Sequence, residues 1–110
     1  MSLLQEIETY GLADCEFNRK LLKGLNMDFI YHTDSGHGWV ETEKAFLKQL
    51  KIDDLITGYS YEYGDKAYLE EDCDLSTLIK ALEEQNITYT LKEVYKDQSP
   101  IRNYPQYKGA

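Results

Sequence analysis

The sequence has few cysteines that could cross-link the chain through disulfides, and few apolar runs that could anchor it in a membrane. Its 110 residues include only two cysteines, Cys15 and Cys73, and neither belongs to a CxxC pair. This argues against a disulfide framework and against a paired-cysteine zinc site. No apolar run approaches membrane-spanning length, and the opening MSLLQEIETYG has acids where a signal peptide would be apolar. We therefore expect a cytoplasmic protein with free thiols and no membrane association.

Positive charge is also scarce. The chain has 12 Lys and Arg against 20 Asp and Glu, giving a formal net charge of −8. A surface this acidic repels nucleic acid and anionic membranes, so we expect no direct nucleic-acid binding. It favours a basic protein surface as the partner, such as the nucleic-acid groove of another protein.

What is present is typical of a folded domain, with 42% hydrophobic and 29% charged residues. Residues 1–26 are predicted to form a helical N-terminal segment, because apolar side chains recur there at helical spacing. These side chains are Leu3, Leu4, Ile7, Phe17, Leu21, Leu22 and Leu25. Residues 27–110 are predicted to be an α+β core domain that ends in an extended tail.

The core reads as ββα-ββα-β. The hairpin MDFIYHT–WVET and the helix EKAFLKQLKI are followed by the strands TGYSYEY and AYLEE, the helix DLSTLIKALEEQN and the strand ITYTLKEVY. Asp74 is predicted to cap the second helix and Asn86 to end it. We expect an antiparallel-rich sheet with the helices on one face. Pro100 and Pro105 predict an extended tail that lies along the body.

HTDSGHGW, residues 32 to 39, is the stretch richest in side chains that could bind a metal or take part in catalysis. His32, Asp34 and His37 could bind a metal, although their spacing is not a strong signature. The alternative is a tight turn, because aspartate and serine hydrogen-bond nearby backbone and glycine supplies positive φ. The turn accounts for Asp34, Ser35 and the glycines, and it leaves the two histidines unexplained.

The densest acidic run is EEDCD, which supplies Glu70, Glu71, Asp72 and Asp74. It could complement the dipole of the helix that follows, hold a divalent cation, or dock on a basic partner. These acids would raise the pKa of the Cys73 thiol, which argues against a reactive thiolate.

The sequence is rich in tyrosine, with ten in 110 residues. Tyr59, Tyr61 and Tyr63 are predicted to line one sheet face. Exposed tyrosines serve protein interfaces and, with a basic surround that this chain lacks, RNA-binding sheets. Burial in a small core is the alternative.

HTDSGHGWVET, YSYEYGDKAYLEEDCD and VYKDQSPIRNY together resemble small uncharacterised proteins of phages, plasmids and their bacterial hosts. Those proteins share a histidine–glycine–tryptophan hairpin, a YLEEDCD-like junction and a SPIR-like tail. The resemblance leaves out the first 26 residues and carries no catalytic residues over. Small acidic proteins of mobile elements are often inhibitors of host defence, including anti-CRISPR proteins.

We therefore expect a non-enzymatic binding protein that needs no cofactor. It would inhibit a defence nuclease by occupying a basic nucleic-acid-binding surface with Glu70, Glu71, Asp72, Asp74 and the tyrosines at 59, 61 and 63. One alternative is a small metal-binding hydrolase or nuclease that uses His32, Asp34 and His37. Another is a structural module that forms a homodimer.

Overall fold

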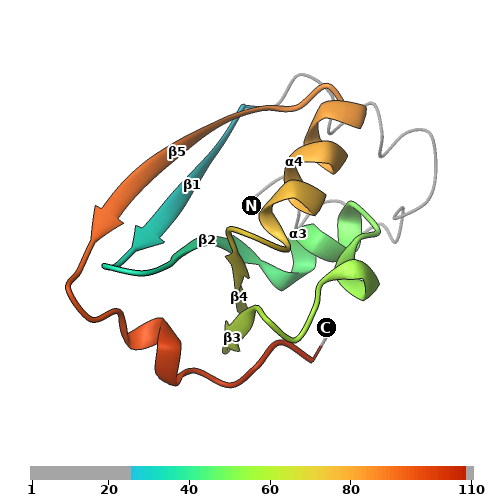
Figure 1. The fold of residues 1–110 in the computed structure, drawn as a ribbon. Helices are drawn as coiled ribbons and strands as arrows, with labels where there is room; N and C mark the ends of the chain where they lie inside the picture. The colour runs from blue at the N-terminus through green and yellow to red at the C-terminus, as the bar shows by residue number, and fades with distance from the viewer. Residues whose placement is uncertain (1–25, 109–110) are drawn as a thin grey trace.

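The computed structural model describes residues 26–108 (Figure 1) and shows an α+β fold with two α-helices and one five-stranded mixed sheet. The elements follow the predicted order, and the expected helical segment lies, apart from Asn26, outside the described residues. The elements are β1 (Asn26–Thr33), β2 (Gly38–Glu43), α3 (Lys44–Gln49), η1 (Asp53–Leu55), β3 (Tyr61–Tyr63), β4 (Lys66–Glu70), α4 (Leu75–Glu84), β5 (Thr88–Tyr95) and η2 (Pro100–Asn103). No helix in this part of the chain is both long and apolar enough to cross a membrane.

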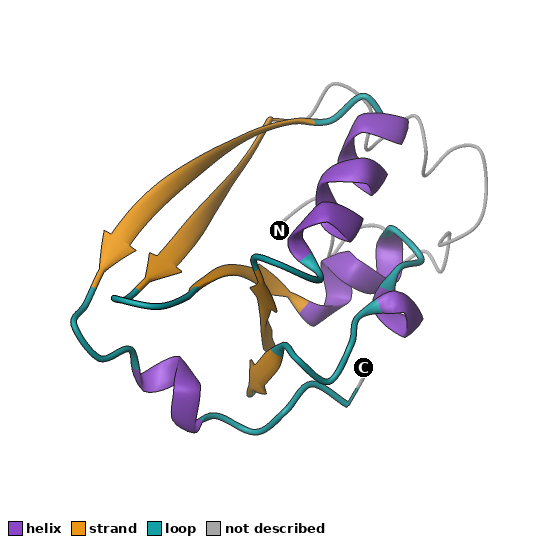
Figure 2. Cartoon of the chain, viewed as in Figure 1, coloured by secondary structure: helices purple, strands orange, loops and turns teal. Residues whose placement is uncertain are grey.

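The strands lie in the order β3-β4-β2-β1-β5. Three neighbouring pairs are antiparallel, as expected, but β5 runs parallel to β1 along its whole length, from Asn26↔Thr88 to Thr33↔Tyr95. Asn86 has a φ of 57° and ends α4 as predicted, so the chain turns directly into β5. Figure 2 shows β1 and β5 side by side, reaching away from the rest of the sheet.

One face of the sheet carries the main core. Val40 and Leu69 point to this face, where Phe46 and Leu47 of α3 and Leu82 of α4 pack against them. All five side chains are at most 1% exposed. Alternation along β2 sends the neighbouring Trp39 to the opposite face. The sheet therefore separates two apolar clusters.

The chain's C-terminal tail covers part of the second face. Ile101 of η2 packs against Trp39 and Tyr68, and Tyr104 lies beside them. Beyond η2 the tail runs along β3, where Pro105 O accepts a hydrogen bond from Glu62 N at 2.8 Å. The tail does lie along the body, but residues 100–103 form a 3-10 turn in place of the expected extended chain, because Ser99 caps that turn by accepting from Ile101 N.

Candidate acidic site at the hairpin tip

The tip between β1 and β2 is held by Asp34. Its Oδ1 accepts the backbone N–H groups of Gly36 and His37 at 3.0 and 2.9 Å, which is the turn chemistry that the sequence predicts. Arg102 of η2 donates to the same carboxylate through Nε at 2.5 Å and Nη2 at 2.9 Å. The Asp34 side chain is only 1% exposed. The tip is therefore fastened to the tail.

Hydrogen bonds from Arg102, followed by those from the Gly36 and His37 backbone, hold the pKa of Asp34 well below its usual range. A depressed pKa stabilises the fold above about pH 4, the unfolded value, and the contribution is lost as the pH falls toward the folded value. We expect the difference in unfolding free energy between wild type and Asp34→Asn to be constant from pH 8 to 5. Urea unfolding should show it shrinking below about pH 4. A difference that stays unchanged in acid, or an equal acid dependence in Asp54→Asn, would contradict this origin.

The two histidines of the loop face different surroundings. His32 Nε2 lies 2.9 Å from Glu41 Oε1, and the His32 ring packs edge-on against Tyr68 at 5.8 Å. His37 instead lies with its ring 6.0 Å from that of Trp39. The group expected from the sequence, His32, Asp34 and His37, is not brought together, because Glu41 and Arg102 engage the first two.

A different group does come together. His37, Glu70 and Asp72 each offer one ligand atom, and these atoms all lie within 4.8 Å of one another. Glu70 ends β4, and Asp72 lies in the turn that leads to α4. Glu71 N donates to Gly38 O at 3.0 Å, so this turn is tied directly to the hairpin tip. The acidic run and the histidine loop therefore lie against each other.

A second cluster of carboxylates lies around the Tyr31 hydroxyl. This hydroxyl donates a hydrogen bond to Glu71 Oε2. Burial, the hydrogen bond to Glu71 and the negative charges of Glu71, Glu93 and Asp72 raise the pKa of Tyr31 to about 12. The ring passes so close to Gly38 that a Cβ there would lie 2.5 Å from the hydroxyl oxygen. We call Glu71, Asp72 and Glu93 the acidic end.

Two of the acids expected at a docking surface are not available there. Asp74 is 1% exposed, and Glu70 is 8% exposed. The Asp74 carboxylate makes no capping hydrogen bond to α4, although it occupies the predicted cap position. It accepts from Thr57 N and Oγ1 and from Ser60 Oγ instead. Of the EEDCD acids, Glu71 and Asp72 remain accessible.

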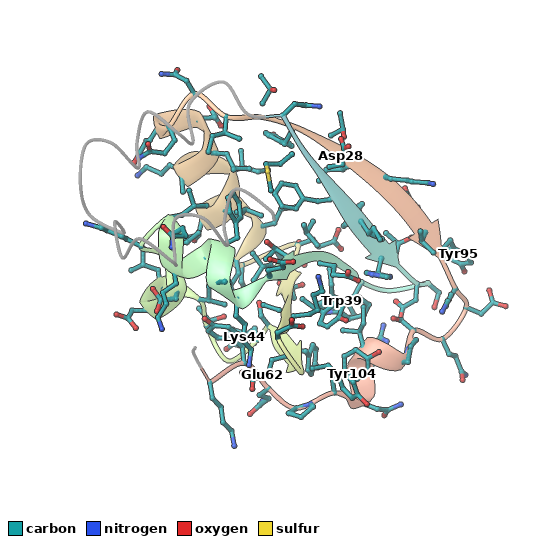
Figure 3. All side chains as sticks on the ribbon, turned by 180° about the vertical axis from the view of Figure 1, so that it is seen from behind. Asp28, Trp39, Lys44, Glu62, Tyr95 and Tyr104 are labelled. Atoms are coloured by element: carbon teal, nitrogen blue, oxygen red, sulfur yellow. The ribbon has the colours of Figure 1, made fainter. Side chains whose placement is uncertain are left out.

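The three tyrosines expected on one sheet face have different environments. Tyr59 lies in a turn before β3 and is 71% exposed, so it is not part of the strand. Tyr61 is half-buried against Trp39. Tyr63 is exposed and packs on Tyr104 of the tail, with ring centres 4.8 Å apart. Figure 3 shows Trp39 and Tyr104 over this part of the sheet.

Partial desolvation and a hydrogen bond to Glu70 raise the pKa of the exposed Cys73 thiol. The direction agrees with the sequence prediction, and it leaves the thiol protonated at neutral pH.

Comparisons of the chain with protein families, with curated proteins and with solved structures find no match.

Proposed function

We propose that this protein is a non-enzymatic binding protein whose acidic end docks on a basic surface of a partner protein. The observation that carries the proposal is the meeting of Glu71, Asp72 and Glu93 from two separate parts of the chain around Tyr31. In residues 26–108, no lysine or arginine forms an ion pair with any of the three. Their charge is therefore open to a partner's cations.

A nucleic-acid-binding surface is the basic partner that we propose. Such a surface is built to neutralise phosphates with lysine and arginine, and carboxylates on a folded scaffold can occupy the same groups. The resemblance to proteins of phages and mobile elements supports a host defence nuclease as the owner of this surface. The protein would then inhibit the nuclease by competing with its nucleic acid.

The placement of the remaining candidates supports binding over catalysis. Arg102 engages Asp34, and Glu41 engages His32, so neither is placed to act on a substrate with His37. The raised pKa of Cys73 disfavours a nucleophilic thiolate. Exposed Tyr63, stacked on Tyr104, offers an aromatic contact of the kind enriched in protein interfaces.

Neutralising the acidic end tests the proposal. We expect the variant Glu71→Gln/Asp72→Asn/Glu93→Gln to bind its partner at least about tenfold more weakly, since three surface charge contacts are lost at roughly 0.5–1 kcal/mol each. The partner is captured from a host lysate at low salt, with EDTA present, and the captured protein is then purified for titration. We expect the captured partner to bind DNA, and we expect added DNA to displace the wild-type protein from that partner.

The matched control removes the same number of charges elsewhere, with Asp54→Asn/Glu83→Gln/Glu84→Gln. These three residues are exposed and lie on η1 and at the end of α4. The control variant should bind like wild type, and high salt should weaken wild-type binding. Equal binding by wild type and the acidic-end variant, or a partner that DNA does not displace, would overturn the proposal.

A further inference from the structure

We propose that His37, Glu70 and Asp72 form a binding site for one divalent first-row transition-metal ion, represented by Zn²⁺. The ligand atoms come from the hairpin tip and from the turn after β4, and they lie within 4.8 Å of one another. This is the one such group of three in the part of the chain that the structure describes. The inference goes beyond the proposed function and does not depend on it.

The distances fit an ion better than a direct contact. His37 Nδ1 lies 3.8 Å from Glu70 Oε1, which is too long for a hydrogen bond. Two ligands bound tetrahedrally to Zn²⁺ at about 2 Å lie roughly 3.3 Å apart. Small rotations of the exposed His37 and Asp72 side chains bring the three atoms to that separation, because neither side chain is packed in the core.

The charge of Glu70 also calls for a cation. The Glu70 side chain is 11% exposed, and the ion-pair partner that Glu70 has within the described residues is His37, at 3.8 Å. Among residues 26–108 no lysine or arginine pairs with Glu70 or Asp72. Burying a carboxylate without a cation is unfavourable, and a bound metal ion would supply the missing charge.

The two ligand-bearing segments are held independently of any ion. Asp34 fixes the backbone of His37 from the tip side, at 2.9 Å from His37 N. Glu70 Oε2 accepts from Asp72 N at 2.9 Å, which orients the Glu70 carboxylate. Because the Glu71–Gly38 backbone bond joins the two segments, the ion has little chain to order when it binds.

The ligand types define the class of ion. One imidazole with two carboxylates suits Zn²⁺, Mn²⁺, Co²⁺ or Ni²⁺, whereas Mg²⁺ and Ca²⁺ prefer oxygen ligands alone. Three protein ligands leave at least one coordination position for water, as in open zinc sites. The chain has no second histidine at this site, so we expect modest affinity.

Trp39, the only tryptophan of the chain, reports directly on this site because its ring lies 6.0 Å from that of His37. We expect the full chain to bind one Zn²⁺ in calorimetry and one Ni²⁺ with quenching of Trp39 fluorescence. His37→Ala and Glu70→Gln should each weaken binding at least about tenfold, since even outer-sphere losses cost 10–100-fold.

His32→Ala is the matched control, because it removes the only other histidine, which lies against Glu41 and not at this site. It should bind Zn²⁺ like wild type. Asp72→Asn serves as a second ligand variant, since exposed Asp72 can be changed without disturbing the core. The proposal is overturned if wild type binds no Zn²⁺, or if His37→Ala and Asp72→Asn bind it as tightly as wild type, which would place the ion elsewhere in the chain.

Discussion

Asp74→Ala is expected to lower the free energy of unfolding by about 3–5 kcal/mol. Both carboxylate oxygens accept from Thr57 N at 3.1 Å, and Oδ2 also accepts from Thr57 Oγ1 at 2.9 Å and from Ser60 Oγ. Alanine leaves these donors without an acceptor in a place where Asp74 is 1% exposed. Because the position is buried, water cannot freely take the place of the lost carboxylate as acceptor.

The network also explains why the loss spreads beyond one contact. Ser60 Oγ accepts from Glu70 N at 3.0 Å, so Asp74 ties the start of α4 to the loop before β3 and to the end of β4. Glu70 in turn supplies one of the two carboxylates of the candidate metal site. We therefore expect Asp74→Ala to weaken both the fold and the geometry of that site.

Urea unfolding followed by Trp39 fluorescence and by circular dichroism measures the effect. Asp72→Ala is the control, because Asp72 is two residues away and exposed, and it should change the stability by less than about 0.5 kcal/mol. Similar unfolding curves for the two variants would show that the buried hydrogen bonds of Asp74 contribute little. If Asp74→Ala fails to fold, Ser60→Ala removes one donor and should give a smaller loss of the same sign.

The local pattern of the sequence predicts the order of the elements well. β-Forming residues on either side of turn residues predict the β1–β2 hairpin, and helical spacing predicts α4 within about one residue at its start. These signals depend on residues a few positions apart, which all lie on one element. Asn86 ends α4 for a similarly local reason, because asparagine tolerates its φ of 57°.

Long-range contacts are what the sequence pattern does not contain. Nothing in ITYTLKEVY indicates that β5 pairs in parallel with β1, some 60 residues away in the register Asn26↔Thr88. The strand expected from Thr57 shrinks to Tyr61–Tyr63, because Asp74 fixes Thr57 and Ser60 in a loop. The same limitation misplaced Asp74, whose acidic neighbours suggest a surface.

The candidate site shows this limitation most clearly. The sequence indicates His37 as a potential ligand, but it groups His37 with His32 and Asp34 because those residues are near it in the chain. Its actual neighbours, Glu70 and Asp72, lie more than 30 positions further along. One signal is present: the ββα pattern occurs twice in succession in the sequence, and β2 of the first unit pairs with β4 of the second. Their pairing brings HTDSGHGW against EEDCD.

Ile101→Ala is the second change expected to have a large effect, at about 2–4 kcal/mol of unfolding free energy. Ile101 is 2% exposed and packs with Trp39 and Tyr68, so alanine leaves a cavity between the tail and the sheet. Leu55→Ala is the matched control, because Leu55 is also a branched aliphatic residue but is 61% exposed, and its loss should be within about 0.5 kcal/mol. Urea unfolding compares the two.

The consequence for function follows from the next residue, Arg102, which holds the carboxylate of Asp34 and stacks over Trp39 at 5.5 Å. Loosening Ile101 should release Arg102, and with it the Asp34 anchor of the His37 backbone. We therefore expect Ile101→Ala to weaken Zn²⁺ binding although it touches no ligand, whereas Leu55→Ala should leave binding unchanged. If Ile101→Ala destabilises the fold but binds Zn²⁺ like wild type, the tail supports the sheet alone and the tip is ordered by its own turn.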